Sequence, residues 1–370
     1  MTRYAILQAG APTPVINASL AGFLHELRDV AEVVGVRGGA EGLVRGRLFP
    51  VPRYDLAELA AQPGAALGAG RFAPSREELA RAAETLRDNG IDGIACNGGN
   101  GTMGLAAAFR DVAESAGVPL RVVGIPKTVD NDLLGTDRSP GFLTCGRFVA
   151  QAVHALGADL RAMAPLERVR VVEVLGRNVG WLGLAAAVHR RTEDDAPHLV
   201  YTPEAPLVFT EFAAAVDKVV SRNGHALVVV AEGGTPEISG DEFVVPRPGR
   251  LLRNGVARVI ADRLAEETGL PVRAEVLGMV QRAASWMAPP RDRADAWAAG
   301  AAAAALLHEG ASGVMAGLDP LSGPGAASTC SPVPLDDVAE RTRAVPFPLA
   351  PGCPDPPAEF RAWWDGLLAE

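Results

Sequence analysis

The sequence of 370 residues has few aromatic side chains, few cysteines and no long apolar run. Aromatic residues make up 5% of the chain, so we expect a core built mainly from Ala, Val and Leu. The four cysteines are widely separated without a CxxC pair, and the six histidines lack metal-ligand spacing, which argues against a disulfide framework and a structural zinc site. No stretch reaches the ~20 apolar residues of a membrane span, and the N-terminus lacks the apolar core of a signal peptide. We therefore expect a cytoplasmic protein without a membrane partner.

An excess of positive charge is also missing, because the formal net charge is -9. An acidic surface disfavours nucleic acids and anionic membranes as partners, although local basic clusters can still bind a small anion. The length allows two domains, each with a substantial core.

Short apolar stretches alternate with helical periodicity along most of the chain. Ser75 and Glu78, for example, form a capping-box pattern that predicts a helix over residues 75–89. The alternation predicts an α/β fold of two similar three-layer domains with mostly parallel sheets and an active site in the cleft between them. We expect one domain over residues 1–139, to which the chain returns around 281–325. The other expected parts are a domain over 140–280 and a C-terminal extension over 326–370, the latter with Pro-rich linkers and a terminal amphipathic helix.

A polar turn follows one of the predicted buried strands. The apolar run Val122–Ile125 ends at a proline, and the turn after it carries Lys127, Asp130 and Asp132. Open α/β sheets bind ligands at the carboxyl ends of their strands. A lysine and two carboxylates at such a place suit phosphate, a divalent cation and a proton acceptor.

Two glycine-rich turns also follow predicted strands, over residues 8–14 and 97–103. Glycines permit a close backbone approach, and N–H groups at a helix start face an anion, so both turns are candidate phosphate cradles. For the second turn we expect the helix to begin at Met103. Arg71, in a further glycine-rich turn, is either a phosphate contact or a solvated loop residue.

Three motifs resemble those of the phosphofructokinase family: Gly98-Gly-Asn-Gly-Thr, Pro126-Lys-Thr-Val-Asp-Asn-Asp and Leu175-Gly-Arg. The match runs in order over nearly the whole chain. The first loop, Gln8-Ala-Gly-Ala-Pro-Thr-Pro, is most similar to the pyrophosphate-dependent branch.

The resemblance implies roles for individual residues. Asp130 matches the general base, Lys127 the lysine that neutralises the transferring phosphoryl group, and Asp132 a carboxylate linked to Mg²⁺, with Asn100 near the metal. The other implied contacts are donor phosphate (Gly10, Arg71, Gly99, Asn100, Gly101, Thr102), sugar (Thr128, Leu175, Gly176, Arg177, Glu232) and sugar phosphate (Arg168, Arg273, Arg282). The domain over 1–139 would bind the donor and that over 140–280 the sugar phosphate. In many members one or two of the arginines come from a neighbouring subunit, which implies a homodimer or homotetramer.

Some positions depart from the family pattern. Ala9 and Ala11 replace a small Ser and Gly, whose loss we expect to crowd the phosphate loop. Gly101 is typical of ATP users, whereas Lys127 is typical of pyrophosphate users. Met279 stands where many members have a histidine that contacts the sugar phosphate.

The favoured function is Mg²⁺-dependent phosphoryl transfer to the 1-hydroxyl of fructose 6-phosphate, with pyrophosphate favoured over ATP as donor. One alternative is an ATP-dependent enzyme or a kinase of another sugar phosphate, such as sedoheptulose 7-phosphate. A catalytically weak homologue that binds a phosphosugar as a regulatory subunit is the other alternative.

Overall fold

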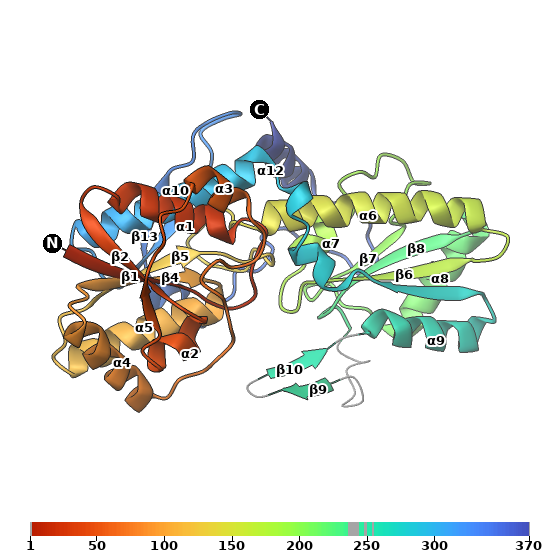
Figure 1. Cartoon of the computed structure of the whole chain (residues 1–370). Coiled ribbons are helices and arrows are strands. Elements are labelled where there is room, and N and C mark those ends of the chain that lie inside the picture. Colours follow the sequence, from red (N-terminus) through yellow and green to blue (C-terminus); the bar gives the residue numbers. More distant parts are fainter. Residues whose placement is uncertain (1, 236–243, 248–249, 254, 370) are drawn as a thin grey trace. The chain divides into compact units, whose positions relative to one another are not determined.

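The computed structural model of the chain describes residues 2–235, 244–247, 250–253 and 255–369 (Figure 1). The chain forms two compact units. The first unit contains Met1–Thr144, Arg282–Arg343 and Leu367–Glu370, and the second contains Cys145–Gln281 and Ala344–Gly366. No helix in the described ranges combines the length and apolar character needed to cross a membrane.

A seven-stranded sheet forms the centre of the first unit, in the order β13-β12-β5-β4-β1-β2-β3. The edge strands β13 and β3 pair antiparallel, and the strands between them are parallel. The mostly parallel α/β architecture predicted from the alternating pattern is therefore confirmed. The strands are β1 (Thr2–Gln8), β2 (Ala31–Val36), β3 (Leu48–Pro50), β4 (Gly93–Gly98), β5 (Arg121–Pro126), β12 (Val314–Leu318) and β13 (Cys330–Pro334).

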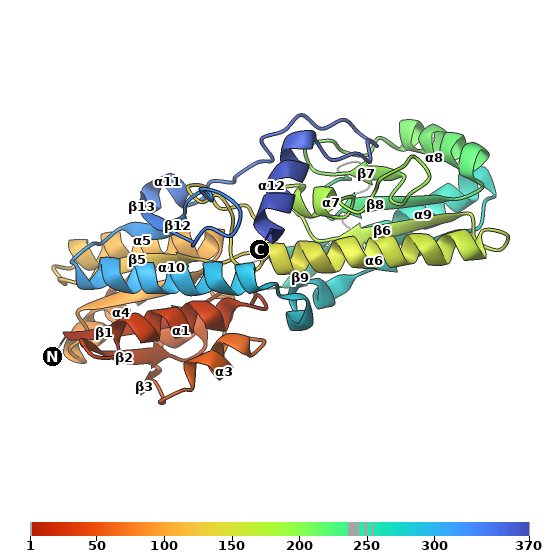
Figure 2. The ribbon, with the colours of Figure 1, turned by 90° about the horizontal axis from the view of Figure 1, so that it is seen from above.

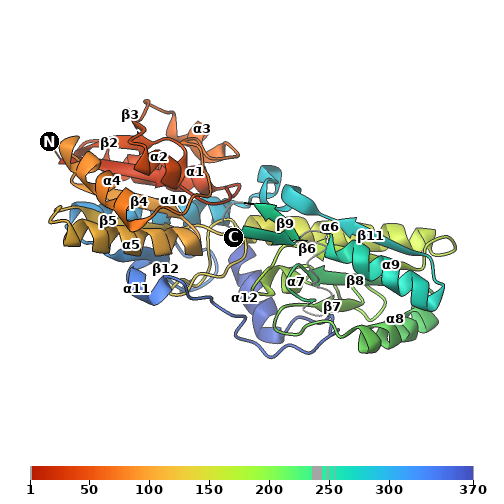
Figure 3. The same ribbon diagram turned by 90° about the horizontal axis from the view of Figure 1, so that it is seen from below.

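Helices cover both faces of this sheet. On one face α1 (Ile16–Leu27) and α10 (Pro290–His308) lie side by side (Figure 2). On the other face lie α4 (Arg76–Asp88) and α5 (Asn100–Ser115) (Figure 3). The predicted capping box begins α4, since Ser75 N–H donates to Glu78 Oε2 (2.8 Å) and Glu78 N–H donates to Ser75 Oγ (3.2 Å). Shorter helices complete the unit: α2 (Gly39–Val44), α3 (Leu56–Ala61) and α11 (Leu335–Val338).

Glycines allow α1 and α10 to touch backbone to backbone. A Cβ added at Gly300 would collide with the Ser19 carbonyl oxygen, and one at Gly22 would collide with the Trp297 carbonyl oxygen. We expect Gly300→Ala to lower the free energy of unfolding by about 1–3 kcal/mol, because overpacking forces the helices apart. Urea unfolding measures this change.

Gly366 in α12 (Ala358–Leu368) is the matched control, since a Cβ there meets nothing within 4 Å. Gly366→Ala should be neutral or stabilising by up to about 1 kcal/mol, because alanine is the better helix former. Unchanged stability of Gly300→Ala would show that the two helices separate without cost.

The second unit has a smaller sheet of four parallel strands, in the order β11-β6-β8-β7. Helix α6 (Phe142–Met163), most of which belongs to this unit, covers one face, and α8 (Phe209–Asn223) and α9 (Val256–Thr268) cover the other (Figures 1 and 3). The strands are β6 (Val169–Val174), β7 (Leu199–Tyr201), β8 (Ala226–Ala231) and β11 (Val272–Val276). Two 3₁₀ helices, η3 (Gly278–Arg282) and η4 (Ser285–Met287), follow β11. A hairpin of β9 (Val244–Arg247) and β10 (Arg250–Arg253) and the short helix α7 (Trp181–Ala185) also belong to this unit. Helical periodicity in the sequence predicts α9 over Asn254–Thr268, and the first residue of that range lies outside the described residues.

Residues 326–370 do not form a separate extension, contrary to our expectation. β13 lies in this segment and pairs with β12, because an edge strand of the first sheet was still unpaired. Residues 344–366 belong to the second unit. There α12 (Ala358–Leu368) buries Phe360 and Trp364, and the Phe360 ring lies 6.2 Å from the Trp181 ring.

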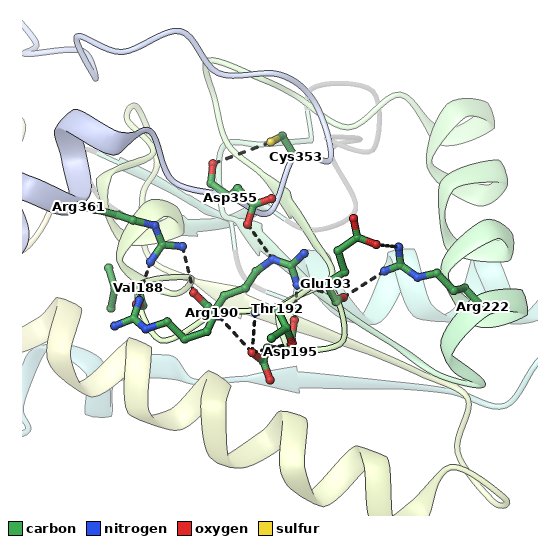
Figure 4. Close-up of polar contacts among 10 residues, drawn as sticks. Val188, Arg190, Thr192, Glu193, Asp195, Arg222, Cys353, Asp355 and Arg361 are labelled. Atoms are coloured by element: carbon green, nitrogen blue, oxygen red, sulfur yellow. Dashed lines mark hydrogen bonds and ion pairs between the residues drawn. The ribbon is translucent and has the colours of Figure 1, made fainter.

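Polar contacts also attach this C-terminal segment to the second unit (Figure 4). Buried Arg190 donates to Asp355 Oδ1 (3.0 Å) and to the Asp195 carbonyl (2.6 Å). Arg361 donates to the carbonyls of Val188 (3.1 Å) and Arg190 (3.2 Å). Aromatic packing and these hydrogen bonds together make residues 344–366 an integral part of the second unit.

Candidate functional site

Three adjacent parallel strands of the first unit, β1, β4 and β5, end at the same edge of the sheet. Hydrogen bonds join the loops that follow them, since Ala9 N–H donates to Asn97 O (2.9 Å) and Lys127 N–H donates to Gly98 O (3.0 Å). The two glycine-rich turns and the polar turn predicted from sequence therefore lie together.

Lys127 is at the centre of this group, and only 2% of the residue is exposed. Its Nζ donates to the Ala11 carbonyl at 2.5 Å. A Cβ at Gly10, where φ is +74°, would lie 3.6 Å from the same Nζ. Burial and, to a smaller extent, the charges of Arg282 and Arg71 lower the pKa of Lys127 to about 7, against the opposing effect of Asp130 and Asp132. This cluster of cationic groups suits a highly charged anion.

The second glycine-rich turn differs from its prediction. Helix α5 begins at Asn100 rather than at Met103, with Gly99 as N-cap. Asn100, Gly101 and Thr102 therefore form its first turn, and Thr102 N–H already donates to the Gly99 carbonyl (2.8 Å). The N–H groups of Asn100 and Gly101 lie at the helix start, where helices bind anions. Gly101 is exposed, and a Cβ added to it meets nothing within 4 Å. A side chain at this position is free to point away from the protein.

Asn100 and Asp132 are in direct contact. Asn100 Nδ2 donates to Asp132 Oδ2 (2.9 Å) and to the Asp132 carbonyl (3.1 Å). Asn100 Oδ1 and Asp132 Oδ1 are buried and accept no hydrogen bond from any described residue.

These two oxygens fit a magnesium ion. Mg²⁺ prefers oxygen ligands and usually takes one or two protein groups together with water and substrate phosphates. Among the residues that the structure covers, no three His, Cys, Asp or Glu side chains are grouped to hold a metal. A metal site completed by substrate oxygens agrees with both observations.

Asp130 lies between two anchored residues of the polar turn. Its N–H donates to Thr128 Oγ1 (3.1 Å), and Thr128 forms a parallel bridge with Gly141. Asn131 is buried at a φ of +56°, unusual for a residue with a side chain, and its Oδ1 accepts from Ser139 N–H (2.8 Å). Backbone strain of this kind is common at functional sites. The contacts to Ser139 and Gly141 were not foreseen, because no local pattern links them to this turn.

The second unit brings together four of the predicted sugar-site residues. Leu175, Gly176 and Arg177 follow β6, and Glu232 follows the neighbouring parallel strand β8. Leu175 N–H donates to Gln281 Oε1 (3.1 Å), and Gly233 N–H donates to the Gly176 carbonyl (3.2 Å). Gly176 has a φ of +127°, which explains the glycine.

Arg168 and Arg273 lie at the other end of the same sheet. Arg168 precedes β6 and donates to the Gly224 carbonyl (2.7 Å). Arg273 pairs in register with Arg170 near the start of β6 and forms an ion pair with Glu167 at 3.5 Å. A strand of six residues spans ~20 Å, so these two arginines do not join Gly176 and Glu232 in this unit.

The remaining predicted residues divide between the units. Thr128 and Arg282 belong to the first unit with Lys127. Met279 lies on η3 and is 53% exposed. The Ala9 side chain is buried in the hydrophobic core of the first unit. Contrary to our expectation, its methyl group therefore does not crowd the phosphate loop. Ala11 contributes its carbonyl oxygen to Lys127.

Glycine-rich turns at strand ends, a lysine and two carboxylates on an α/β sheet define a phosphotransferase. The chain belongs to the phosphofructokinase family, whose model matches residues 3–307. It is 38% identical over 322 residues to a sulfofructose kinase from Alkalicoccus urumqiensis, covering 85% of this chain and 83% of the relative. A pyrophosphate--fructose 6-phosphate 1-phosphotransferase from Xanthomonas campestris is 32% identical over 355 residues, covering 92% and 84%. The crystal structure of a pyrophosphate-dependent phosphofructokinase from Marinobacter aquaeolei is similar with a TM-score of 0.87 and 27% identity, covering 100% of this chain and 92% of the other.

Proposed function

We propose that this protein transfers a phosphoryl group to the 1-hydroxyl of a fructose derivative that carries an anionic group on C6. The observation that carries the proposal is that Lys127, Asp130, Asp132 and Asn100 follow neighbouring strands at one sheet edge, where Asn100 donates to Asp132 and the two carboxylates act on the charge of Lys127. Fructose 6-phosphate, giving fructose 1,6-bisphosphate, is the first acceptor that we propose.

The residues divide the chemistry among them. Asp130 takes the proton from the sugar hydroxyl as its oxygen attacks the terminal phosphoryl group. Lys127, beside Gly10, places a positive charge on the transferring phosphoryl oxygens. Asn100 Oδ1 and Asp132 Oδ1 would hold Mg²⁺, which neutralises phosphate charge when bound.

The catalytic groups argue against a purely regulatory role. A protein that only binds a phosphosugar needs neither a buried lysine nor two carboxylates beside the donor loops. Both are present here, and Lys127 is held in place by the Ala11 carbonyl.

Pyrophosphate is the donor that we favour over ATP. Lys127 and the similarity to pyrophosphate-dependent relatives support this choice, whereas Gly101 favours ATP. We expect Gly101→Asp to reduce any ATP-dependent activity at least about tenfold, because the added carboxylate repels the α-phosphate, and to change pyrophosphate use much less. The space around Gly101 accommodates the side chain without a clash.

Steady-state rates with each donor measure this effect. Gly101→Asn, of similar size without the charge, is the control. Equal ATP use by the Gly101→Asp variant and the parent would contradict the charge argument.

A sulfonated sugar is the second candidate acceptor. The relative of 38% identity is named sulfofructose kinase. A sulfonate carries one negative charge and a phosphate close to two, so replacing a histidine contact by Met279 suits the less charged group. Sedoheptulose 7-phosphate is a further alternative, because Met279 departs from the family pattern at a sugar-phosphate position.

We further propose that the enzyme is a cytoplasmic homodimer or homotetramer. Arg168 and Arg273 lie about 20 Å from the sugar-site loops of their own sheet. They would hold the C6 anion of a neighbouring subunit, while Arg282 acts within its own chain. Bidentate guanidinium pairing suits phosphate and sulfonate alike.

A crossed assay tests the proposal. Pyrophosphate and ATP are each combined with fructose 6-phosphate, sulfofructose and sedoheptulose 7-phosphate in the presence of Mg²⁺. We expect turnover with pyrophosphate and a fructose derivative that is anionic at C6. If no pair gives turnover and a sugar phosphate binds in calorimetry, the enzymatic function is contradicted and the regulatory alternative is supported.

A further inference from the structure

Two carboxylates at the start of α10 lie outside the groups to which we have given a role. Asp292 is 1% exposed and Asp295 is 2% exposed. Burying a carboxylate is costly unless hydrogen bonds compensate for the lost water. Each of the two is compensated by the same segment of the first unit, residues 136–144.

Asp292 holds both ends of the turn that leads into α6. Its Oδ1 accepts from Gly141 N–H (2.9 Å), and its Oδ2 accepts from Thr144 N–H (2.9 Å) and from the Thr144 hydroxyl. Burial raises the pKa of Asp292 to about 6, against the opposing effect of these donors. Both carboxylate oxygens are thus used to fix the backbone of this turn.

Asp295 fixes the start of the same segment. It forms a bidentate ion pair with Arg138, with both distances 2.7 Å, and Arg138 also donates to the Asp319 carbonyl (2.9 Å). The pair is buried on both sides, which makes its geometry specific. The segment has little room to adjust, because a Cβ at Gly141, where φ is +105°, would collide with the Thr13 side chain.

Residues 136–144, fixed in this way, support the polar turn that carries Asp130. Gly141 forms the backbone bridge with Thr128, two residues before Asp130. Ser139 N–H donates to Asn131 Oδ1, the residue after Asp130, and holds it at its positive φ. Asp292 therefore bonds directly to Gly141, and residues 139 and 141 contact the turn on both sides of Asp130.

We infer that Asp292 is a positioning residue for phosphoryl transfer: through Gly141 and Thr144 it fixes the backbone that holds Asp130. The inference rests on the proposed function for its kinetic part only. Its structural part, the rigidity of residues 126–134, is measurable without any substrate.

Asp292→Asn is the variant that tests this role. The amide keeps the size of the carboxylate, yet its NH₂ group faces either the Gly141 N–H or the Thr144 N–H, so one hydrogen bond becomes a repulsion. We expect kcat to fall about 10- to 100-fold, because a small displacement of a catalytic group costs this much, with KM for both substrates changed less than about twofold. Amide hydrogen exchange in peptides covering residues 126–134 should become faster.

Glu309→Gln is the matched control, an exposed carboxylate at the other end of α10. It should leave kcat and exchange unchanged. If Asp292→Asn fails to fold, Thr144→Val removes only the hydroxyl donor and is measured in the same way, with Thr144→Ser expected to restore the parent behaviour.

The two failures are distinguishable. If the parent protein turns over no donor and acceptor, the proposed function fails, and exchange over residues 126–134 still decides the positioning role. A lower thermal midpoint with unchanged kcat per folded molecule and unchanged exchange would overturn the inference, because Asp292 would then contribute stability alone.

Discussion

Replacing Asp130 by asparagine is expected to reduce kcat about 10²- to 10⁴-fold, the range typical for loss of a general base. The amide has nearly the same size as the carboxylate and cannot accept the proton of the attacking hydroxyl. The Asp130 N–H still donates to Thr128, so the turn should keep its conformation. Steady-state kinetics measures the loss, and circular dichroism with a thermal melt checks the fold.

Asp111→Asn is the matched control, because Asp111 is a half-exposed carboxylate on α5 that pairs with Arg110 on the surface. It should keep parent activity. A near-normal kcat for Asp130→Asn would remove Asp130 from the role of base.

Replacing Lys127 by methionine should lower kcat/KM for the phosphoryl donor about 10²- to 10³-fold, as expected for losing one preorganised charged donor. Methionine fills the buried space left by the lysine chain, so the change acts mainly on charge. The affinity for the sugar acceptor should change far less. Steady-state kinetics with each substrate varied separates the effect on the donor from that on the acceptor, and inhibition by donor analogues measures donor binding alone.

The lowered pKa of Lys127 adds a pH dependence with a defined sign. Below pH 7 the amine of the free enzyme is mostly protonated and attracts the anionic donor, and above pH 7 it is mostly neutral. We expect kcat/KM for the donor to fall as pH rises through about 7, since this parameter reports the free enzyme.

In Lys127→Met, the fall of kcat/KM above pH 7 that is due to the lysine should disappear. The pH dependence that comes from titration of the donor itself persists in both proteins and serves as the internal reference. An identical pH dependence of kcat/KM in the parent and in Lys127→Met would assign it to the donor alone. Donor binding should also take up protons near pH 8, because a bound phosphate favours the charged amine.

The grouping of the three loops at one sheet edge is predictable from sequence because the information is local. The turn with Lys127, Asp130 and Asp132 follows an apolar run, and parallel pairing of β4 and β5 brings it beside Asn100. The capping box at Ser75 is equally local and was confirmed.

Other features depend on contacts between distant parts of the chain. Asp292 and its partner Gly141 are separated by 151 residues, so no spacing rule links them. The Pro-rich sequence of β13 predicts a linker, and only the free edge of β12 makes it a strand. Helix α8 was missed in the same way, although Phe209, Phe212 and Val216 bury one face of it.

Glycine-rich sequence also hides where a helix begins. Asn100, Gly101 and Thr102 read as a turn, yet they form the first turn of α5 because the Gly99 carbonyl accepts the N–H groups of Thr102 and Met103. The separation of Arg168 and Arg273 from Gly176 within one chain likewise follows from strand geometry and from no local pattern.

The order of strands in the first unit has a consequence for synthesis on the ribosome. β5 is an interior strand of the finished sheet, yet its neighbour β12 lies at residues 314–318. Until that part emerges, one edge of β5 presents unpaired N–H and C=O groups, which is a template for aggregation. The nascent chain therefore carries the turn with Lys127, Asp130 and Asp132 on an open edge while the whole of residues 145–281 is translated.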